Sequence, residues 1–388
     1  MKLQAILNTF PKARGEKIDW QALEKTTLAT ILRDMENTMQ YHEYHGEGNV
    51  YNHTKMVCEA MISDDEFWTL AKNQREIMLL SALLHDIGKI KCTKMVDGKL
   101  ESPRHAKTGA LMARELLWRE YGLCGTKEKQ NIRESVSAYI KYHSYPPFAI
   151  QNSNPNLKMI RVASQGKLAP DFSIKNLCLL ERADAIGRIG TSTNDYLERV
   201  ECCRMLAEEL NCLEKPYDFK DAYTERAFYK GQTNYLASQL YNDTWGEVIM
   251  LAGLPGTGKD TYIKNNYPNM PVVCLDQIRI EKKISPLGNQ GEVAQVAKEK
   301  ARELLRKKQP FIWNATSLNE QLRSTIISLL EQYGARVKII FLETDYQEQL
   351  KRNSSRKAEV PMEAIEKMLS KLEIPESHEA QDVIWQIT

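Results

Sequence analysis

The stretch Gly253-Leu-Pro-Gly256-Thr-Gly258-Lys259-Asp260-Thr261 decides the fold of the C-terminal half of the chain. It follows a short apolar run at 248–252 and precedes a helical pattern, which is the context of a Walker A phosphate-binding loop. In such a loop, glycines let backbone N–H groups curl around nucleotide phosphates, and the lysine reaches the β and γ oxygens. The residues expected to contact NTP phosphates are Gly253, Pro255, Gly256, Thr257, Gly258, Lys259, Asp260 and Thr261.

One position departs from this pattern. The Ser or Thr that normally follows the lysine and binds Mg²⁺ is replaced by Asp260, and Thr261 comes one position later. Either Asp260 contacts the metal, directly or through water, or the metal is held less tightly.

The sequence around this loop alternates between strands and helices. Apolar runs at 272–275, 311–313 and 337–342 predict further buried strands, separated by helical patterns at 292–308, 318–333 and 361–373. This alternation is typical of a parallel α/β sheet. Residues 21–240 instead show apolar positions at helical spacing, at 75–90, 107–121, 130–142, 174–186 and 197–213. We therefore expect two domains, an all-α domain at 1–240 and an α/β P-loop kinase domain at 241–388, with the boundary inside 232–246.

Charged residues after two later elements fit a phosphoryl-transfer site. Asp276 follows the predicted strand at 272–275, where a carboxylate can accept a proton from an acceptor hydroxyl, and Arg279 can hold an acceptor phosphate. Taken alone, the pair also fits a helix N-cap and a solvated arginine. Arg352 and Arg356 are four residues apart, so on a helix they share a face that can close over the phosphates.

Histidine is concentrated in the N-terminal half, where six of the seven lie between residues 42 and 143. Imidazoles and carboxylates on apolar helices suit Zn, Mn, Fe, Co or Ni ions. The predicted ligands for one or two such ions are His53, His85, Asp86, His105, His143 and Asp184. A first ion would be bound by His53, His85 and Asp184, a second by His105 and His143, and Asp86 would bridge the two. Two ions about 4 Å apart can activate a water molecule and hold a phosphoryl group between them.

Composition limits the class of protein. The chain is 42% hydrophobic and 27% charged, which excludes a disordered tail, and its net charge of +2 excludes gross attraction to nucleic acid while allowing a local basic groove. No apolar run approaches the roughly 20 residues of a membrane span. The N-terminus lacks a secretory apolar region, and the eight cysteines form no CxxC pair. We expect a soluble, cytoplasmic protein with reduced cysteines.

The motifs resemble two known families. The loop GLPGTGKDT, the segment DQIR at 276–279 and the run KRNSSRKAEVP make residues 247–373 similar to phage-type polynucleotide 5′-hydroxyl kinases. This resemblance implies that Lys259 binds phosphates, Asp276 is the general base for the 5′-hydroxyl, and Arg279 contacts the 3′-side phosphate of the acceptor. It also implies that Arg352 and Arg356 form a lid. Asn314 stands where such kinases often carry an acidic residue after a strand.

The N-terminal half, over about residues 38–190, resembles the HD phosphohydrolase superfamily through LLHDIGK at 83–89 and the order of its His and Asp residues. The stretch QYHEYHGEGNVYNHT at 40–54 is similar to the entry of HD domains that act on RNA ends. That likeness implies that His42 and His45 line the phosphate site, and that Lys89 and Arg188 contact substrate phosphate.

Together the two halves resemble the bifunctional HD-Pnk family of RNA end-healing enzymes. The resemblance implies phosphorylation of 5′-hydroxyl ends, and removal of 2′,3′-cyclic, 2′- or 3′-phosphates at the other end. We expect ATP or GTP with Mg²⁺ in the kinase site, RNA or DNA ends as substrates and no membrane. An RNA ligase acting downstream and a homodimer are open options for partners.

Two other functions stay open at this point. The HD half suits a nucleotidase or cyclic-nucleotide phosphodiesterase fused to a small-molecule kinase, and only acceptor preference separates that enzyme from a repair enzyme. Alternatively, the P-loop half senses NTP and gates the HD site. A sensor would bind NTP without acceptor-dependent turnover, and Asp276→Ala would leave its function intact.

Overall fold

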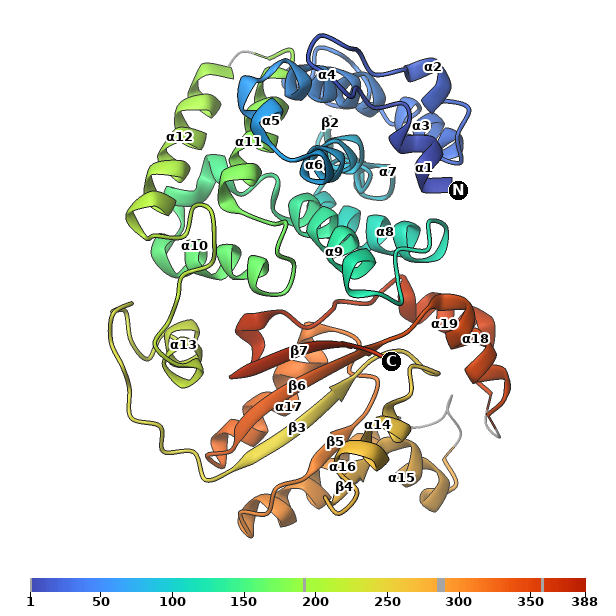
Figure 1. Cartoon of the computed structure of the whole chain (residues 1–388), viewed down its shortest axis with the longest axis vertical. Helices are drawn as coiled ribbons and strands as arrows, with labels where there is room; N and C mark the ends of the chain where they lie inside the picture. The colour runs from blue at the N-terminus through green and yellow to red at the C-terminus, as the bar shows by residue number, and fades with distance from the viewer. Residues whose placement is uncertain (1, 191–192, 285–289, 357–358) are drawn as a thin grey trace. The chain divides into compact units, whose positions relative to one another are not determined.

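The computed structural model describes residues 2–190, 193–284, 290–356 and 359–388. The chain forms two compact units. The first contains the residues up to Leu123 together with Glu128–Tyr217, and the second contains Asp218–Thr388 with the short segment Cys124–Lys127. In Figure 1 the helices of the first unit run from blue to green, and the sheet of the second runs from yellow to red.

The first unit is a bundle of helices. Its helices are α1 (Lys2–Leu7), α2 (Trp20–Leu23), α3 (Ala29–Glu36), α4 (Val50–Ser63), α5 (Asp65–Thr69), α6 (Lys72–Leu84), α7 (Lys89–Cys92), α8 (His105–Arg119), α9 (Lys127–Tyr142), α10 (Pro155–Ala163), α11 (Ile174–Ile186) and α12 (Thr193–Glu209), with short 3₁₀ turns at Pro146–Gln151 and Ser164–Lys167. Helix α4 packs against α6 and α11, and α11 packs against α12. The side chains of Asn49 and Ser173 cap α4 and α11 by accepting a backbone N–H at each helix start.

The predicted helical class of this unit is confirmed, with two local differences. A small antiparallel hairpin, β1 (Lys94–Val96) paired with β2 (Lys99–Glu101), interrupts the helices. The helix predicted at 75–90 is wrong in its C-terminal part, because α6 ends at Leu84 and α7 starts at Lys89. The residues between them form the turn that carries His85 and Asp86.

The second unit is built on a five-stranded sheet, and its predicted parallel α/β class is confirmed. Its strands lie in the order β4 (Val272–Cys274), β5 (Ile312–Asn314), β3 (Glu247–Ala252), β6 (Arg336–Glu343) and β7 (Asp382–Ile387). Strand β3 is central and apolar, and five of its six residues are buried. This burial is typical of a parallel sheet covered on both faces.

One helix precedes these strands and the others connect them. They are α13 (Ala222–Tyr229), α14 (Lys259–Asn266), α15 (Leu275–Lys282), α16 (Gln290–Arg306), α17 (Glu320–Gln332), α18 (Tyr346–Ser354) and α19 (Met362–Leu369), with a 3₁₀ turn at Ser377–Glu379. Strand β7, which was not predicted, lies beyond all of them in the sequence and pairs with β6.

Strand order and domain boundary both depend on the observed topology. Strand β5 lies between β4, which precedes Asp276, and β3, which precedes the P-loop. The division between the units falls at Tyr217, earlier than the predicted 232–246. Helix α13 belongs to the second unit because Arg226 forms an ion pair with Glu331 of α17, 2.7 Å apart, and donates to the carbonyl of His378.

The eight cysteines carry free thiols. Across the described ranges, no helix combines the length and the apolar character required to cross a membrane.

Candidate active sites

The His-Asp dipeptide of the first unit lies in the turn between α6 and α7, at the centre of the bundle. His85 and Asp86 are both almost fully buried. The turn approaches the start of α8 so closely that a Cβ at Gly88 would lie 2.1 Å from the carbonyl oxygen of His105. Only glycine fits there, and this close approach brings His105 against Asp86.

Four histidine side chains meet in this region, and the Nδ1 atom of each faces acceptors. In three of them, Nδ1 lies within hydrogen-bond distance of one backbone carbonyl oxygen. The distances are 2.7 Å from His85 to Ala82, 2.9 Å from His105 to Ser102, and 2.8 Å from His143 to Ile140. The fourth, His53, faces the carbonyl of Gly187 at 3.1 Å and the Glu47 carboxylate at 3.0 Å. A carbonyl accepts but does not donate, so Nδ1 carries the hydrogen and the Nε2 lone pair of the neutral ring is free for a metal.

The Nε2 atoms converge in two pairs. His53 and His85 approach to 3.3 Å, and His105 and His143 also approach to 3.3 Å. Asp86 lies between the pairs, with Oδ2 3.3 Å from His85 and Oδ1 3.4 Å from His105. Its Oδ1 is buried and makes no hydrogen bond.

A second carboxylate completes one end of this cluster. Asp184 Oδ1 lies 2.9 Å from His53 Nε2 and 4.0 Å from His85 Nε2. Asp86 therefore lies between two groups of the predicted ligands, with His53, His85 and Asp184 on one side and His105 and His143 on the other. Neutral imidazoles and carboxylates in this number fit a pair of divalent transition-metal ions.

The electrostatics of His105, His143 and the two carboxylates agree with a donor set that is ready for cations, whereas at His53 the hydrogen bonds with Asp184 and Glu47 outweigh burial and raise the pKa. Burial, reinforced by the neighbouring imidazoles, lowers the pKa of His143 to about 3, and burial also lowers that of His105. Burial opposes the ionisation of Asp86 and Asp184, but nearby cationic and imidazole groups outweigh it and hold the pKa of both carboxyls well below the usual range. The two carboxylates are therefore ionised and the two imidazoles are neutral at pH 7.

Both predicted phosphate-contacting cations border the cluster. Lys89 Nζ lies 2.6 Å from Asp86 and 2.6 Å from the side-chain oxygen of Gln40. Arg188 holds both oxygens of Asp184 through one Nη atom, at 3.1 and 3.2 Å, while its buried Nε makes no hydrogen bond. These cations are placed to attract a phosphate ester to the cluster.

Glu47 contacts two of these histidines and was not among the predicted site residues. Its side chain is 2% exposed and lies 2.8 Å from His45 Nδ1 and 3.0 Å from His53 Nδ1. Burial opposes its ionisation, but the hydrogen bonds from both imidazoles hold its pKa well below the usual range. The only sequence signal was a carboxylate set between Gly46 and Gly48, two residues after His45.

The two histidines of the entry segment have different surroundings. His45 lies against the cluster, with its ring centroid 5.0 Å from that of His53, and burial lowers its pKa to about 4. His42 is exposed and packs its ring against Tyr41 instead. The ring contact of His42 is with Tyr41 rather than with the cluster, and its place at the phosphate site stays a prediction.

In the second unit, the P-loop follows β3 at the carboxyl edge of the sheet, where parallel α/β sheets bind ligands. Its backbone turns through positive φ angles at Gly253, Gly256 and Gly258. A Cβ at Gly256 would lie 2.6 Å from the carbonyl oxygen of Gln349, whose side chain donates to the carbonyl of Pro255. Helix α18 thus packs directly on the loop and fixes its shape.

The lysine and the unusual aspartate occupy the start of α14. Lys259 Nζ donates to the carbonyls of Gly253 and Leu254, both at 2.9 Å, and burial lowers its pKa to about 8. Asp260 Oδ1 accepts a 2.8 Å hydrogen bond from the side-chain amide of Asn314, at the end of β5. A carboxylate therefore lies between P-loop and β5, although the position at the end of β5 itself is an amide. Together with NTP phosphates, Asp260 fits Mg²⁺, which proteins usually hold with one or two carboxylates.

The residues predicted to act on the acceptor form a second group near this loop. Asp276 lies on the first turn of α15 and pairs with Arg279, and its other oxygen lies 3.8 Å from Arg356. Arg352 is on α18, pairs with Glu348 at 2.9 Å and lies near Gly258. The expected shared helical face is wrong, because α18 ends at Ser354 and Arg356 lies beyond it.

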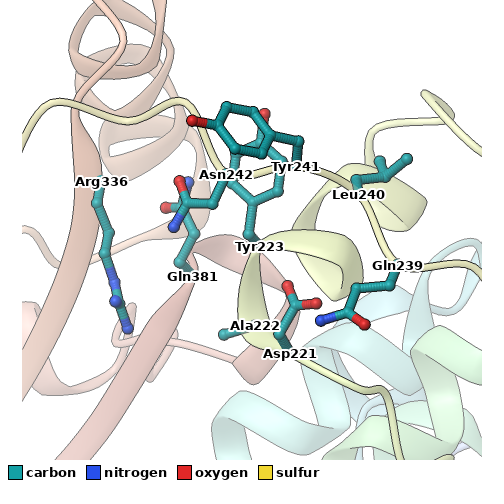
Figure 2. A pocket seen from close by; sticks show the side chains of 9 residues that line it. All are labelled: Asp221, Ala222, Tyr223, Gln239, Leu240, Tyr241, Asn242, Arg336 and Gln381. Atoms are coloured by element: carbon teal, nitrogen blue, oxygen red, sulfur yellow. The ribbon is translucent and has the colours of Figure 1, made fainter.

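A pocket of about 710 Å³ lies at the opposite, amino edge of the sheet (Figure 2). It is lined by Asp221, Ala222, Tyr223, Gln239, Leu240, Tyr241, Asn242, Arg336 and Gln381. Arg336 begins β6 and Gln381 precedes β7, so this pocket is separate from the P-loop edge. It contains none of the predicted site residues.

Two family models match separate parts of the chain. Residues 49–186 match the HD domain and residues 248–375 match the AAA domain. The first match spans every residue of the histidine–aspartate cluster, and the second spans the P-loop, Asp276, Arg352 and Arg356. The chain is therefore a fusion of an N-terminal helical HD phosphohydrolase domain and a C-terminal P-loop kinase-like domain with a parallel sheet.

Proposed function

We propose that this protein heals RNA ends with two active sites. Its kinase unit transfers the γ-phosphate of an NTP to a 5′-hydroxyl end, and its HD unit removes a 2′,3′-cyclic, 2′- or 3′-phosphate from the other end. The observation that carries this proposal is the presence, in one chain, of the four-imidazole cluster around Asp86 and of the P-loop with its Asp276–arginine group. One arrangement suits phosphoester hydrolysis and the other suits phosphoryl transfer.

In the HD unit, the residues of the cluster hold the metal ions, and the protein orients the phosphate. Bound divalent ions supply an activated water and neutralise the charge on the phosphoryl oxygens. Lys89 and Arg188 add two positive charges at the rim of the cluster. His45, hydrogen-bonded to Glu47, is placed to contact the ester or its leaving group.

In the kinase unit, Lys259 and the glycines of the loop hold the β- and γ-phosphates. Asp276 accepts the proton of the attacking 5′-hydroxyl, and Arg279 holds the adjacent 3′-side phosphate. Arg352 and Arg356 neutralise charge that develops on the transferred phosphoryl group. The Asp276 side chain is 64% exposed, so the end of a polymer can reach it.

The two reactions are complementary in their chemistry. Cleavage of RNA by attack of its own 2′-hydroxyl leaves a 5′-hydroxyl and a 2′,3′-cyclic phosphate. The kinase converts the first into a 5′-phosphate, and the phosphoesterase converts the second into a free hydroxyl. The product pair is the one that an RNA ligase joins, so a ligase is the expected downstream partner.

Acceptor preference tests the kinase half of the proposal. Labelled NTP is supplied with Mg²⁺ and a 5′-hydroxyl RNA, a 5′-hydroxyl DNA, a nucleoside or a small polyol. Transfer to the polynucleotides must disappear in Lys259→Ala and persist in Lys264→Ala, which changes an exposed lysine on the same helix. Transfer only to the nucleoside or polyol would refute the polynucleotide assignment, and NTP binding without transfer would favour the sensor.

Release of phosphate from a 3′-phosphate or 2′,3′-cyclic RNA end tests the other half. The activity must disappear in Asp86→Asn and remain in Asp97→Asn, an exposed aspartate in the β1–β2 turn. Hydrolysis of mononucleotides by the wild type without action on either RNA end would contradict the proposal.

A further inference from the structure

Gln40 is a buried polar residue at the edge of the histidine–aspartate cluster, and only 7% of it is exposed. It lies at the base of the loop formed by residues 38–50, next to the antiparallel bridge between Met39 and Asn49. Its backbone N–H donates to the carbonyl of Gly48 across the base of this loop, at 2.9 Å. These backbone contacts hold Gln40 in a fixed place.

The side-chain amide of Gln40 has one chemically allowed orientation. Its Oε1 lies 2.6 Å from Nζ of Lys89, and the same Nζ lies 2.6 Å from Oδ2 of Asp86. An ammonium group only donates hydrogen bonds, so it must face the oxygen of the amide and not the nitrogen. A continuous set of contacts therefore joins Gln40, through Lys89, to the carboxylate at the centre of the cluster.

The nitrogen of this amide is left without an acceptor. Gln40 Nε2 is buried and makes no hydrogen bond with any residue that the structure describes. A buried donor without a partner costs free energy, and native structures pair most such groups. Asp86 Oδ1 and Arg188 Nε, at the same cluster, are also buried and without a hydrogen bond in the described part of the chain. One of these atoms is an acceptor suited to a cation and the other two are donors suited to an anion, as a site for a metal-bound phosphate requires.

We propose that Gln40 binds the substrate, and that its Nε2 donates a hydrogen bond to a non-bridging oxygen of the phosphate ester that the HD cluster hydrolyses. The inference rests on the proposed function and adds a substrate-binding residue to that site. Gln40 and Lys89 are neighbouring donors on the Asp86 side of the cluster, whereas Arg188 holds Asp184 on the other side. The two non-bridging oxygens of a bound phosphodiester therefore meet different donors.

A role in holding Lys89 explains only half of the Gln40 side chain. Lys89 needs an acceptor at this position, and a carboxylate would supply one without leaving a buried N–H group unpaired. The amide adds a donor that no described residue uses. A phosphate oxygen accepts hydrogen bonds and carries negative charge, so it satisfies this donor and is also attracted by the ammonium group of Lys89.

The test uses RNA ends that carry a 2′,3′-cyclic phosphate or either diastereomer of the cyclic phosphorothioate, in which sulfur replaces one non-bridging oxygen. Sulfur is a weak hydrogen-bond acceptor. Values of kcat/KM for ring opening are measured for the wild-type holoenzyme, Gln40→Met and Gln40→Glu. Gln21→Met, which changes an exposed glutamine on α2, is the control.

Two binding measurements accompany the kinetics. Calorimetry gives the affinity of each Co²⁺-loaded protein for inorganic phosphate, which reports phosphate binding without turnover. Titration of Co²⁺ into the metal-depleted proteins shows whether the variants keep their metal sites.

We expect Gln40→Met to lower kcat/KM about 10- to 100-fold on the oxygen ester and on one diastereomer, the range for a hydrogen bond to a charged group. On the other diastereomer, whose sulfur replaces the oxygen that faces Gln40, the substitution should have little effect, because that hydrogen bond is already weakened. Phosphate affinity should fall by a similar factor in Gln40→Met, while its Co²⁺ affinity and all properties of Gln21→Met should match the wild type.

Equal losses in Gln40→Met on the oxygen ester and both diastereomers would show a structural role and overturn the proposal. Wild-type phosphate affinity in Gln40→Glu would also overturn it, because this variant still gives Lys89 an acceptor but has no N–H group to donate. If the wild type hydrolyses p-nitrophenyl phosphate but no RNA end, the proposed function fails, whereas weaker phosphate binding by Gln40→Met would still support Gln40 as a donor to phosphate.

Discussion

Glu47→Gln offers a specific test of how the cluster is organised, because it changes one atom outside the predicted set of metal ligands. One carboxylate oxygen of Glu47 accepts from Nδ1 of His45 and of His53, and the other accepts from the backbone N–H of Ile189 at 3.0 Å. All three neighbours are donors. A glutamine at this position must turn its own NH₂ group toward a donor, so at least one of these hydrogen bonds is lost.

The structure sets the expected size of the effect. A hydrogen bond to a charged group contributes about 1.5–3 kcal/mol, which corresponds to roughly 10- to 100-fold in an equilibrium constant. His53 keeps a second acceptor in the carbonyl of Gly187, so its tautomer is preserved and only its basicity falls. We therefore expect metal affinity at the His53 side to fall about tenfold, the lower end of the range for such outer partners.

Metal affinity is measured by titrating Co²⁺ or Mn²⁺ into metal-depleted protein and following binding calorimetrically. Glu43→Gln is the matched control, since it makes the same change at an exposed position of the same loop. If Glu47→Gln binds metal within twofold of the wild type while retaining its fold, Glu47 does not support the cluster and this reasoning is refuted.

Three further predictions concern the second unit. Because burial lowers the pKa of Lys259 to about 8, the side chain is mainly charged at pH 7 and loses its proton above pH 8, so NTP binding should weaken above pH 8 and take up protons there. Calorimetry in buffers of different ionisation enthalpy measures that uptake, and its absence at pH 8.5 would contradict the prediction. Replacing Asp260 with Asn should raise the Mg²⁺ concentration needed for NTP binding by roughly tenfold, because a carboxylate is lost beside the phosphates. A Mg²⁺ titration with a fluorescent NTP tests this, and an unchanged midpoint would exclude a role for Asp260 in metal binding. Arg323→Met should destabilise the unit by about 3–5 kcal/mol, because Arg323 is buried against Glu379 through two 2.7 Å hydrogen bonds, whereas Arg302→Met breaks a surface pair and should cost less than about 1 kcal/mol. Chemical denaturation measures the free energy of unfolding of both variants, and equal values would contradict the conclusion that the Arg323–Glu379 ion pair matters more for stability than the surface pair of Arg302.

Local sequence patterns predicted the main elements of both halves. The P-loop was predictable because glycines, lysine and flanking strand occur within a dozen or so residues of each other. The helical class of the first unit followed from apolar spacing, and the members of the cluster followed from the type and order of their side chains. In each case the signal lies within one element or one motif.

Features that depend on long-range contacts were not predictable in this way. Strand β7 is a strand because it pairs with β6, which lies far away in sequence. The position of β5 between β4 and β3 likewise depends on pairing between strands that are far apart in sequence, which local patterns do not show. Glu47 has an ordinary sequence context, and only the approach of His53 to it shows its role.

The break in the helix at His85 has a similar cause. The apolar pattern continues past this residue, but Gly88 packs against the start of α8 and stops the helix there. The position of Arg356 was mistaken because helical spacing alone does not show where α18 ends. Tertiary packing decides such boundaries.

The most direct test of two separate sites in one chain is complementation between two inactive variants. A single RNA that carries a 5′-hydroxyl and a 2′,3′-cyclic phosphate is treated with Lys259→Ala, with Asp86→Asn, or with a mixture of the two proteins. The account predicts that Lys259→Ala heals only the 3′ end, that Asp86→Asn heals only the 5′ end, and that the mixture heals both. Loss of both activities in either variant, or a mixture that leaves one end unhealed, would contradict it.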